Sequence, residues 1–173
     1  LLASRILGKV AIKEGYDVKV SEVHGMSQRG GSVVTYVKYG DKVYSPIIDR
    51  GEADLILAFE MLEAMRALPY LKKGGKMIAN TQKMNPMPVI TGAMEYPENI
   101  EEKLSAKINL QAVDALSLAE KAGTIKAVNV VLIGLLAKSM DVDKNVWIDV
   151  IKETVPEKFL DVNIKAFELG YEL

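Results

Sequence analysis

The chain has 173 residues, of which 49% are hydrophobic and 26% are charged, a composition typical of a globular protein with a sizeable core. Its net charge of −1 gives no general attraction to polyanions, so neither nucleic acid nor an anionic membrane is an expected partner. The sequence contains no cysteine and one histidine, which excludes disulfides, thiol catalysis and iron–sulfur ligation by this chain and disfavours zinc. A reducing cytoplasm fits this composition.

Apolar spacing and turn residues predict an alternation of helices and strands along the chain. The expected strands are 16–23, 32–39, 42–48, 53–59, 76–80 and 108–114. The expected helices are 1–14, 60–71, 98–107, 115–123, 125–140, 142–155 and 156–170. A turn is expected at 72–75, and a Pro-rich loop at 81–97, within which PVIT reads as extended.

This order predicts an α/β fold with three layers, α/β/α, around a mixed and mostly parallel sheet. Gly40-Asp41 between two β-patterned runs predicts one β-hairpin, 32–39 with 42–48. Residues 125–173 form a helical C-terminal region, packed on the rest of a single domain, 1–173. Ligands of such sheets bind at the carboxyl ends of the strands.

A donor-rich loop stands at the mouth of the second expected strand. Arg29 suits a phosphate or carboxylate because its planar guanidinium forms bidentate hydrogen bonds. An equally good interpretation is a flexible polar loop in which two glycines make the turn. The histidine is a candidate general base, or a loop residue with only local hydrogen bonds. The loop's candidate site residues are His24, Ser27, Gln28, Arg29, Gly30, Gly31 and Ser32.

Three further candidates follow the predicted parallel strands. Glu60 ends one strand and begins a helix, where it either faces a ligand or complements the helix dipole. Asn80 and Thr81 end the next strand and either line the ligand mouth or begin an ordinary polar loop. Methionines are core residues by default, but Met84 and Met87 in the Pro-rich loop are candidates for a partner surface.

Three stretches of the chain together resemble a known family. They are HGMSQRGGSVVTYVKYGDKVYSPII, GEADLILAFEMLEAMRALPYLKKGGKMIANT and the tail VPEKFLDVNIKAFELGYE. The chain is similar over essentially its whole length to the gamma-type domain of the 2-oxoacid:ferredoxin oxidoreductases. Within that family it most resembles the beta subunit of indolepyruvate ferredoxin oxidoreductases. Family members usually open with a strand and a Gly-rich loop of the G-x-G-G-Q-G type, and we expect that segment to be missing here.

The resemblance implies the non-cofactor subunit of an enzyme that is inactive without its partner. The implied reaction is oxidative decarboxylation of indolepyruvate and other aryl pyruvates with coenzyme A. Its products are aryl-acetyl-CoA, carbon dioxide and reduced ferredoxin. Thiamine diphosphate and iron–sulfur clusters are expected on the larger partner subunit, which passes electrons to ferredoxin. No metal site and no catalytic residue are expected on this chain.

The resemblance also suggests a role for the donor-rich loop. His24 to Ser32 would face the partner's active site, where Arg29 meets an anionic group of coenzyme A, substrate or thiamine diphosphate. Asn80 and Thr81 would line the same mouth. Two alternatives are a stand-alone nucleotide- or CoA-binding module without a redox role, and a Rossmann-type dehydrogenase in which Glu22 binds the ribose.

Overall fold

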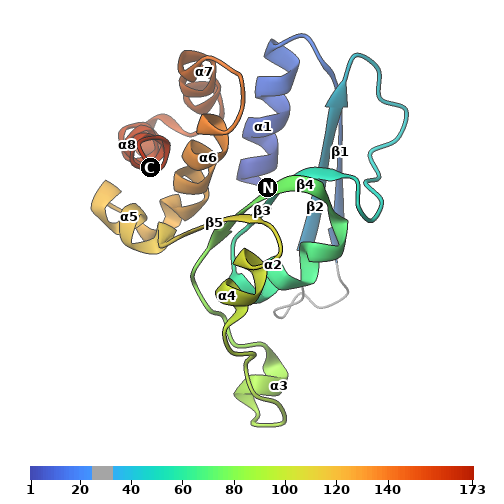
Figure 1. Ribbon diagram of the computed structural model, residues 1–173. Coiled ribbons are helices and arrows are strands. Elements are labelled where there is room, and N and C mark those ends of the chain that lie inside the picture. Colours follow the sequence, from blue (N-terminus) through green and yellow to red (C-terminus); the bar gives the residue numbers. More distant parts are fainter. Residues whose placement is uncertain (25–32) are drawn as a thin grey trace. The chain divides into compact units, whose positions relative to one another are not determined.

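The structure is a computed structural model that describes residues 1–24 and 33–173, and its chain divides into two compact units (Figure 1). Unit 1 contains Leu1–Glu22, Thr35–Ile48 and Ala115–Leu173. Unit 2 contains Asp49–Asp114 and the described residues of Val23–Val34. Each unit is described by itself below.

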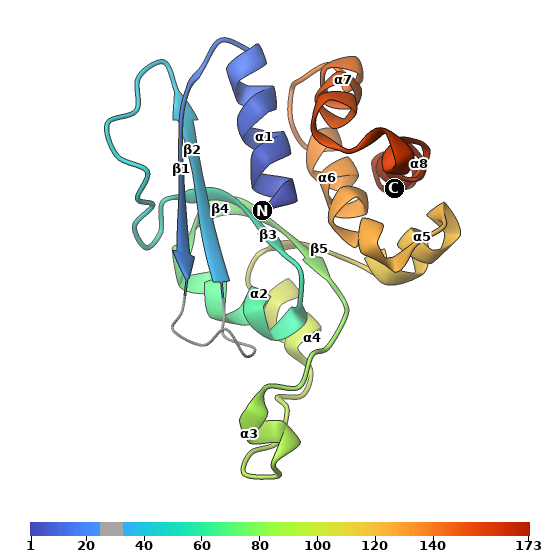
Figure 2. The ribbon, with the colours of Figure 1, turned by 180° about the vertical axis from the view of Figure 1, so that it is seen from behind.

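Unit 1 is built from helices and most of a two-stranded sheet. The strands are β1 (Asp17–His24) and β2 (Val33–Gly40), which run in opposite directions (Figure 2). The helices are α1 (Leu2–Lys13), α5 (Ala115–Ala122), α6 (Val128–Lys138), α7 (Lys144–Thr154) and α8 (Leu160–Tyr171), with the 3-10 turns Ile125–Ala127 and Glu157–Phe159. The predicted helical C-terminal region is confirmed.

Helices α6 and α8 approach each other so closely that their backbones touch. A Cβ added at Gly134 of α6 would lie 2.2 Å from the carbonyl oxygen of Phe167 in α8. A Cβ added at Gly170 of α8 would lie 2.0 Å from the carbonyl oxygen of Val131 in α6. Because α6 is apolar on nearly all faces, its central residues are buried, as expected of a helix enclosed by its neighbours.

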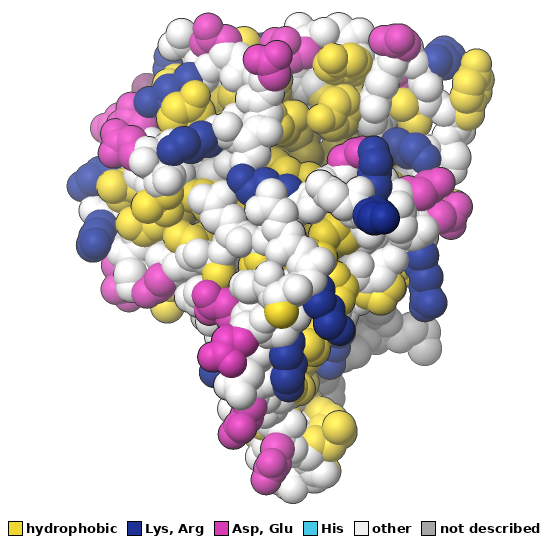
Figure 3. Space-filling model, viewed as in Figure 1, with side chains coloured by type: hydrophobic (Ala, Val, Ile, Leu, Met, Phe, Trp, Pro, Cys, Tyr) yellow, Lys and Arg dark blue, Asp and Glu magenta, His cyan; other side chains and the backbone are white. Residues whose placement is uncertain are grey.

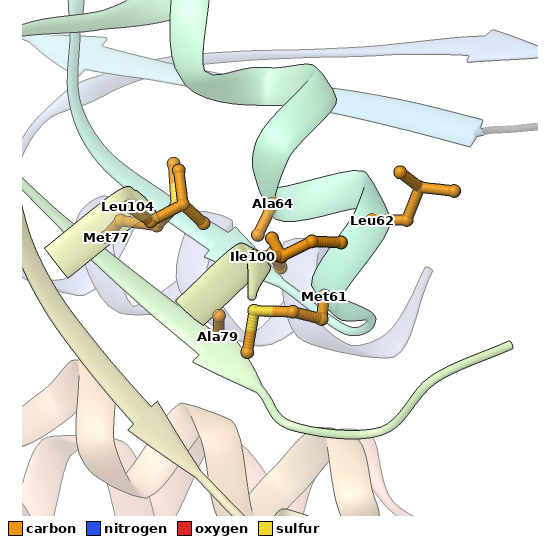
Figure 4. Close-up of a cluster of buried hydrophobic side chains, with 8 residues drawn as sticks. Met61, Leu62, Ala64, Met77, Ala79, Ile100 and Leu104 are labelled. Carbon is orange, nitrogen blue, oxygen red and sulfur yellow. The ribbon is translucent and has the colours of Figure 1, made fainter. Parts of the chain in front are cut away.

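Unit 2 is a parallel sheet with helices packed on it. Its strands lie in the order β3-β4-β5, all parallel. The elements are β3 (Ala53–Ala58), α2 (Met61–Ala67), a 3-10 turn (Leu68–Tyr70), β4 (Leu71–Asn80), α3 (Met87–Ile90), α4 (Ile100–Ser105) and β5 (Asn109–Val113). Figure 4 shows the core, in which Met61 of α2, Met77 of β4 and Leu104 of α4 are buried together.

The turn predicted at 72–75 lies inside β4. Ala53 pairs with Leu71, but Leu55 pairs with Lys76, so β4 carries extra residues opposite β3. Gly74 has a φ of 81°, and a Cβ at Gly75 would lie 2.9 Å from the carbonyl oxygen of Asp54. The two glycines therefore allow a bulge where the sequence suggested a reversal of the chain.

The predicted hairpin of 32–39 with 42–48 is wrong, whereas the α/β class is confirmed. β2 pairs with β1 instead, and residues 42–48 contain no strand. The Asp17 carboxylate accepts a hydrogen bond from Val43 N at 2.9 Å, and Lys38 Nζ donates to Ile47 O at 3.1 Å. Side chains thus bind backbone groups of this segment, and Pro46 has no N–H to offer a ladder. The expected single mixed sheet is two separate sheets among the described residues.

The PVIT stretch, expected to be extended, lies in and just after the short helix α3. Ile90 N donates to Pro86 O at 3.0 Å, and Thr91 N donates to Met87 O at 2.9 Å. Pro88 is compatible with this turn because a proline in the first turn of a helix loses no hydrogen bond.

We expect Gly134→Ala to lower the free energy of unfolding by about 3 kcal/mol, because the added methyl group forces α6 away from α8. Gly8→Ala in α1 is the matched control. A Cβ at Gly8 would meet only Val20 and Val18 side-chain atoms at 3.6 and 3.8 Å, so the higher helix propensity of alanine should make that variant neutral or up to about 1 kcal/mol more stable. Urea unfolding followed by circular dichroism measures both. Equal effects at the two positions would contradict the backbone contact.

Candidate functional site

The carboxyl ends of the three parallel strands meet at one edge of unit 2. Ala58 of β3 pairs with Ala79 of β4, and Asn80 of β4 pairs with Val113 of β5, so the strands end side by side. Thr81 N continues the pattern by donating to Val113 O at 2.9 Å. The segments that leave this edge carry the polar residues that the sequence placed there.

Glu60 is the central group of this edge, and its side chain is only 6% exposed. One carboxylate oxygen caps α2 by accepting from Glu63 N at 2.9 Å. The other accepts from Met84 N at 3.1 Å and from the hydroxyl of Tyr96. An anion at a helix N-terminus is also favoured by the helix dipole. Glu60 therefore joins the start of α2 to both ends of the segment that carries α3.

Tyr96 donates to this carboxylate from the far end of that segment. Burial, followed by the hydrogen bond to Glu60 and the charge of Glu60, raises the pKa of the Tyr96 hydroxyl well above its usual value. Lys83 Nζ lies 5.8 Å from the centre of the Tyr96 ring, a distance at which a cation is attracted to the ring face. The hydroxyl thus remains a hydrogen-bond donor throughout the neutral range.

Asn80 is fully buried and bridges two strand ends. Its Nδ2 donates to Phe59 O and to Gln82 Oε1, each at 3.3 Å. Met61 N donates to Gln82 O at 3.1 Å, which adds a second bond between the same two segments. The amide of Asn80 therefore holds the ends of β3 and β4 together.

A cleft of about 460 Å³ opens beside these residues. It contains one cation, Lys83, and two carboxylates at the start of α4, so its wall is polar and of mixed charge. Asn99, before α4, has a φ of 55°. The lining residues are Met61, Thr81, Lys83, Asn99, Ile100, Glu101, Glu102 and Ser105.

The structure brings three of the predicted site residues together and leaves the loop untested. Glu60, Asn80 and Thr81 all lie at the carboxyl edge, although only Thr81 lines the cleft. The backbone of His24 ends β1. The other candidates lie outside the described residues, so their roles stay predictions: Ser27, Gln28, Arg29, Gly30, Gly31 and Ser32.

Sequence reasoning missed Tyr96 and Lys83. Tyr96 lies 36 residues from its partner Glu60, and no local pattern links the two positions.

Among the described residues, no three His, Cys, Asp or Glu side chains form a group that could hold a metal ion. In the same part of the chain, no helix combines the length and apolar character that crossing a bilayer requires.

Comparisons with known proteins show which family this chain resembles in sequence and in fold. Residues 1–173 match the family described as pyruvate ferredoxin/flavodoxin oxidoreductase. The indolepyruvate oxidoreductase subunit IorB of Pyrococcus horikoshii is 45% identical over 98% of this chain and 87% of its own. The ketoisovalerate oxidoreductase subunit VorA of Methanothermobacter marburgensis is 27% identical over 95% of this chain but only 32% of its own length. A crystal structure of the keto/oxoacid ferredoxin oxidoreductase gamma subunit from Geobacter sulfurreducens aligns with a TM-score of 0.71 and 24% identity, over 99% of this chain and 88% of that one.

The fold is thus that of an α/β domain shared with oxoacid oxidoreductase subunits. This chain belongs to the pyruvate ferredoxin/flavodoxin oxidoreductase family. The resemblance drawn from the sequence to the indolepyruvate-type beta subunit is confirmed by these matches.

Replacing Tyr96 by Phe should lower the free energy of unfolding by about 1–2 kcal/mol, because the Glu60 carboxylate loses a donor while it stays buried. Tyr44→Phe removes the same hydroxyl from a side chain that is 89% exposed, and it should change stability by less than about 0.5 kcal/mol. Chemical denaturation of the three proteins at pH 7 measures the difference. If the two variants behave alike, the Tyr96 bond contributes nothing.

The pKa shift of Tyr96 predicts how stability changes with pH. Above about pH 10, the usual pKa of tyrosine, the unfolded chain releases the Tyr96 proton while the folded chain keeps it. The folded state then binds more protons, so the free energy of unfolding falls as pH rises. The Phe variant lacks this titration, and the stability gap between wild type and Tyr96→Phe should narrow as the pH rises above about 10. A gap that is constant over this range would count against the shift.

Proposed function

We propose that this chain is the non-cofactor subunit of a 2-oxoacid:ferredoxin oxidoreductase that acts on indolepyruvate and other aryl pyruvates. The observation that carries the proposal is 45% identity to an indolepyruvate oxidoreductase subunit across nearly the whole chain. We take both compact units as parts of one gamma-type domain, since the family match runs through both.

In the proposed reaction, the bond between the carboxylate and the carbonyl carbon of the 2-oxo acid breaks and carbon dioxide leaves. The acyl group forms a thioester with the sulfur of coenzyme A, whose thiol proton is released. The electron pair left by this oxidation reduces ferredoxin. The overall change therefore balances with ferredoxin as the oxidant. We place the reaction in the cytoplasm.

The donor set of this chain does not fit the cofactors of such a reaction. The sequence contains no cysteine to hold an iron–sulfur cluster, and no three His, Cys, Asp or Glu side chains among the described residues lie together in a way that could hold a metal ion. As the family resemblance implies, we propose that a larger partner subunit holds thiamine diphosphate and the clusters. The length of the VorA relative supports such a partner, because the region similar to this chain is 32% of that protein.

For this chain we propose a positioning role. The loop from His24 to Ser32 would approach the partner's active site, with Gly30-Gly31 permitting close contact and Arg29 binding an anionic group of coenzyme A or substrate. Thr81, at the carboxyl edge of unit 2, would line the same mouth, and buried Asn80 would hold that edge in place.

A second candidate function is a stand-alone CoA- or nucleotide-binding module. The polar cleft beside Lys83 favours it, because a lysine can pair with a phosphate group. Calorimetric titration of the isolated chain with coenzyme A separates the two. Tight binding without any partner supports the module, and binding only in the assembled complex supports the subunit.

The reaction itself is tested by co-expressing this chain with the proposed large subunit. Reduction of a dye acceptor should require both proteins, indolepyruvate and coenzyme A together. A complex that assembles and oxidises other 2-oxo acids, but not aryl pyruvates, would agree with the family assignment and contradict the proposed substrate.

In that complex, Arg29→Ala should raise the apparent KM for indolepyruvate or for coenzyme A by about tenfold, because a bidentate contact to an anion is lost. Arg50→Ala, at an exposed arginine of unit 2, is the charge-matched control and should leave both constants unchanged. Steady-state kinetics with each substrate varied in turn measures the effect. Unaltered kinetics in the Arg29 variant would contradict the assignment of Arg29 to an anionic group of coenzyme A or substrate.

A further inference from the structure

The segment from Met84 to Met94, called here the apolar finger, exposes an unusual amount of hydrophobic surface. Met84, Met87, Ile90 and Met94 are 62%, 59%, 65% and 65% exposed. The eleven residues MNPMPVITGAM contain no charged side chain, in a chain of which 26% is charged. Among the described methionines, the exposed ones all belong to this segment, and the others are buried or half-buried.

The apolar finger has a defined structure. Its tip is α3, extended by a bond from Thr91 Oγ1 to Met87 O at 3.0 Å, and Met94 N donates to Pro88 O at 3.0 Å. Its base is fixed at both ends to the same carboxylate, because Met84 N and the Tyr96 hydroxyl both donate to Glu60. Within unit 2, the views in Figures 1 and 2 agree that α3 stands away from α2 and α4.

The composition of this segment is that of the centre of a protein interface. Interface cores are depleted of charge and enriched in methionine, which adapts its shape to a partner. Figure 3 shows hydrophobic side chains on the surface of the segment that carries α3, with acidic side chains beside them. Lys83 and Glu95 flank the finger in sequence, so charged residues border it on both sides while none lies within it. Such an arrangement favours an apolar socket with a polar rim.

We propose that the apolar finger inserts into an apolar socket on the larger, cofactor-bearing subunit; this inference rests on the proposed function. The length of the VorA relative supports this occupant, because there the similar region adjoins roughly two thirds of a longer chain. A second copy of this chain is a poorer occupant. Two clefts in the described part of unit 2 carry charged groups in their lining, one Lys83, Glu101 and Glu102 and the other three lysines. An uncharged finger would bury those charges without pairing them.

The test is the affinity between the full chain and the co-expressed large subunit. Met87→Ser combined with Ile90→Thr should raise the Kd by about tenfold or more, since truncation of a central apolar anchor weakens an interface by that order. Ile125→Thr is the matched control, because Ile125 is 57% exposed, lies in unit 1 and undergoes the same substitution. Its Kd should stay within about twofold of wild type. Thermal melts of the free chains verify that the variants are folded.

A second readout separates docking from chemistry. In the dye-reduction assay, the finger variant should need a higher chain concentration for half-maximal rate but reach the wild-type plateau. A variant that binds like wild type overturns the finger as a docking element and leaves the proposed function intact. The wild-type complex could also fail to oxidise indolepyruvate while the variant still lowers the affinity between the subunits. That result would support the finger as a docking element and overturn indolepyruvate as the substrate.

A measurement of self-association tests whether a second copy of this chain, and not the large subunit, binds the finger. Sedimentation of the free wild-type chain should show a monomer, or an oligomer that the finger variant leaves unchanged. A homodimer that Met87→Ser/Ile90→Thr dissociates would overturn the large subunit as the partner of the finger. Failure of the wild-type chain to bind the large subunit at all would overturn both the docking proposal and the proposed function.

Discussion

The buried carboxylate of Glu60 is the constraint on which the carboxyl edge of unit 2 depends. A buried charge is costly unless hydrogen bonds replace the water it has lost. Here the donors come from three places, namely the first turn of α2, Met84 and Tyr96. Satisfying one charge therefore sets the direction of α2 and brings together the two ends of a segment that has no buried residues in its own helix.

Unit 1 is held together by a different physical principle. Its helices α6 and α8 cross with backbone against backbone, and the contact depends on the absence of side-chain atoms at Gly134 and Gly170. Such a contact gains dispersion energy over a large area, and it tolerates no added volume. A polar anchor thus orders the edge of unit 2, where the candidate site lies, and close packing orders the helices of unit 1.

The sequence predicted those elements whose signal is local. Continuous apolar runs at 53–59 and 76–80 marked two neighbouring strands of the parallel sheet, and parallel strands place their carboxyl ends together, which correctly grouped Glu60 with Asn80. The failures have non-local causes. Gly74-Gly75 makes a bulge only because β3 lies alongside. The hairpin failed because Asp17, far away in sequence, binds Val43 N.

The candidate site shows the same division. The position of Glu60 directly after a strand predicts that it lies at this edge. The sequence does not predict its hydrogen-bond partners, because nothing near Tyr96 indicates where the Tyr96 hydroxyl points. The Pro-rich loop around Met84 and Met87 makes them candidates for a partner surface from sequence alone. The participation of Ile90 and Met94 required the folded arrangement of the segment, including the helix at its tip.

The exposed methionines of the apolar finger also have a chemical consequence. Thioethers that are open to solvent react with peroxide to give sulfoxides, which are polar, whereas buried Met61 and Met77 are shielded. Oxidation of the free chain would therefore begin at the finger and convert its apolar surface into a polar one while leaving the core untouched. The folded subunit would survive such damage with its core intact, but it would meet its partner with an altered surface.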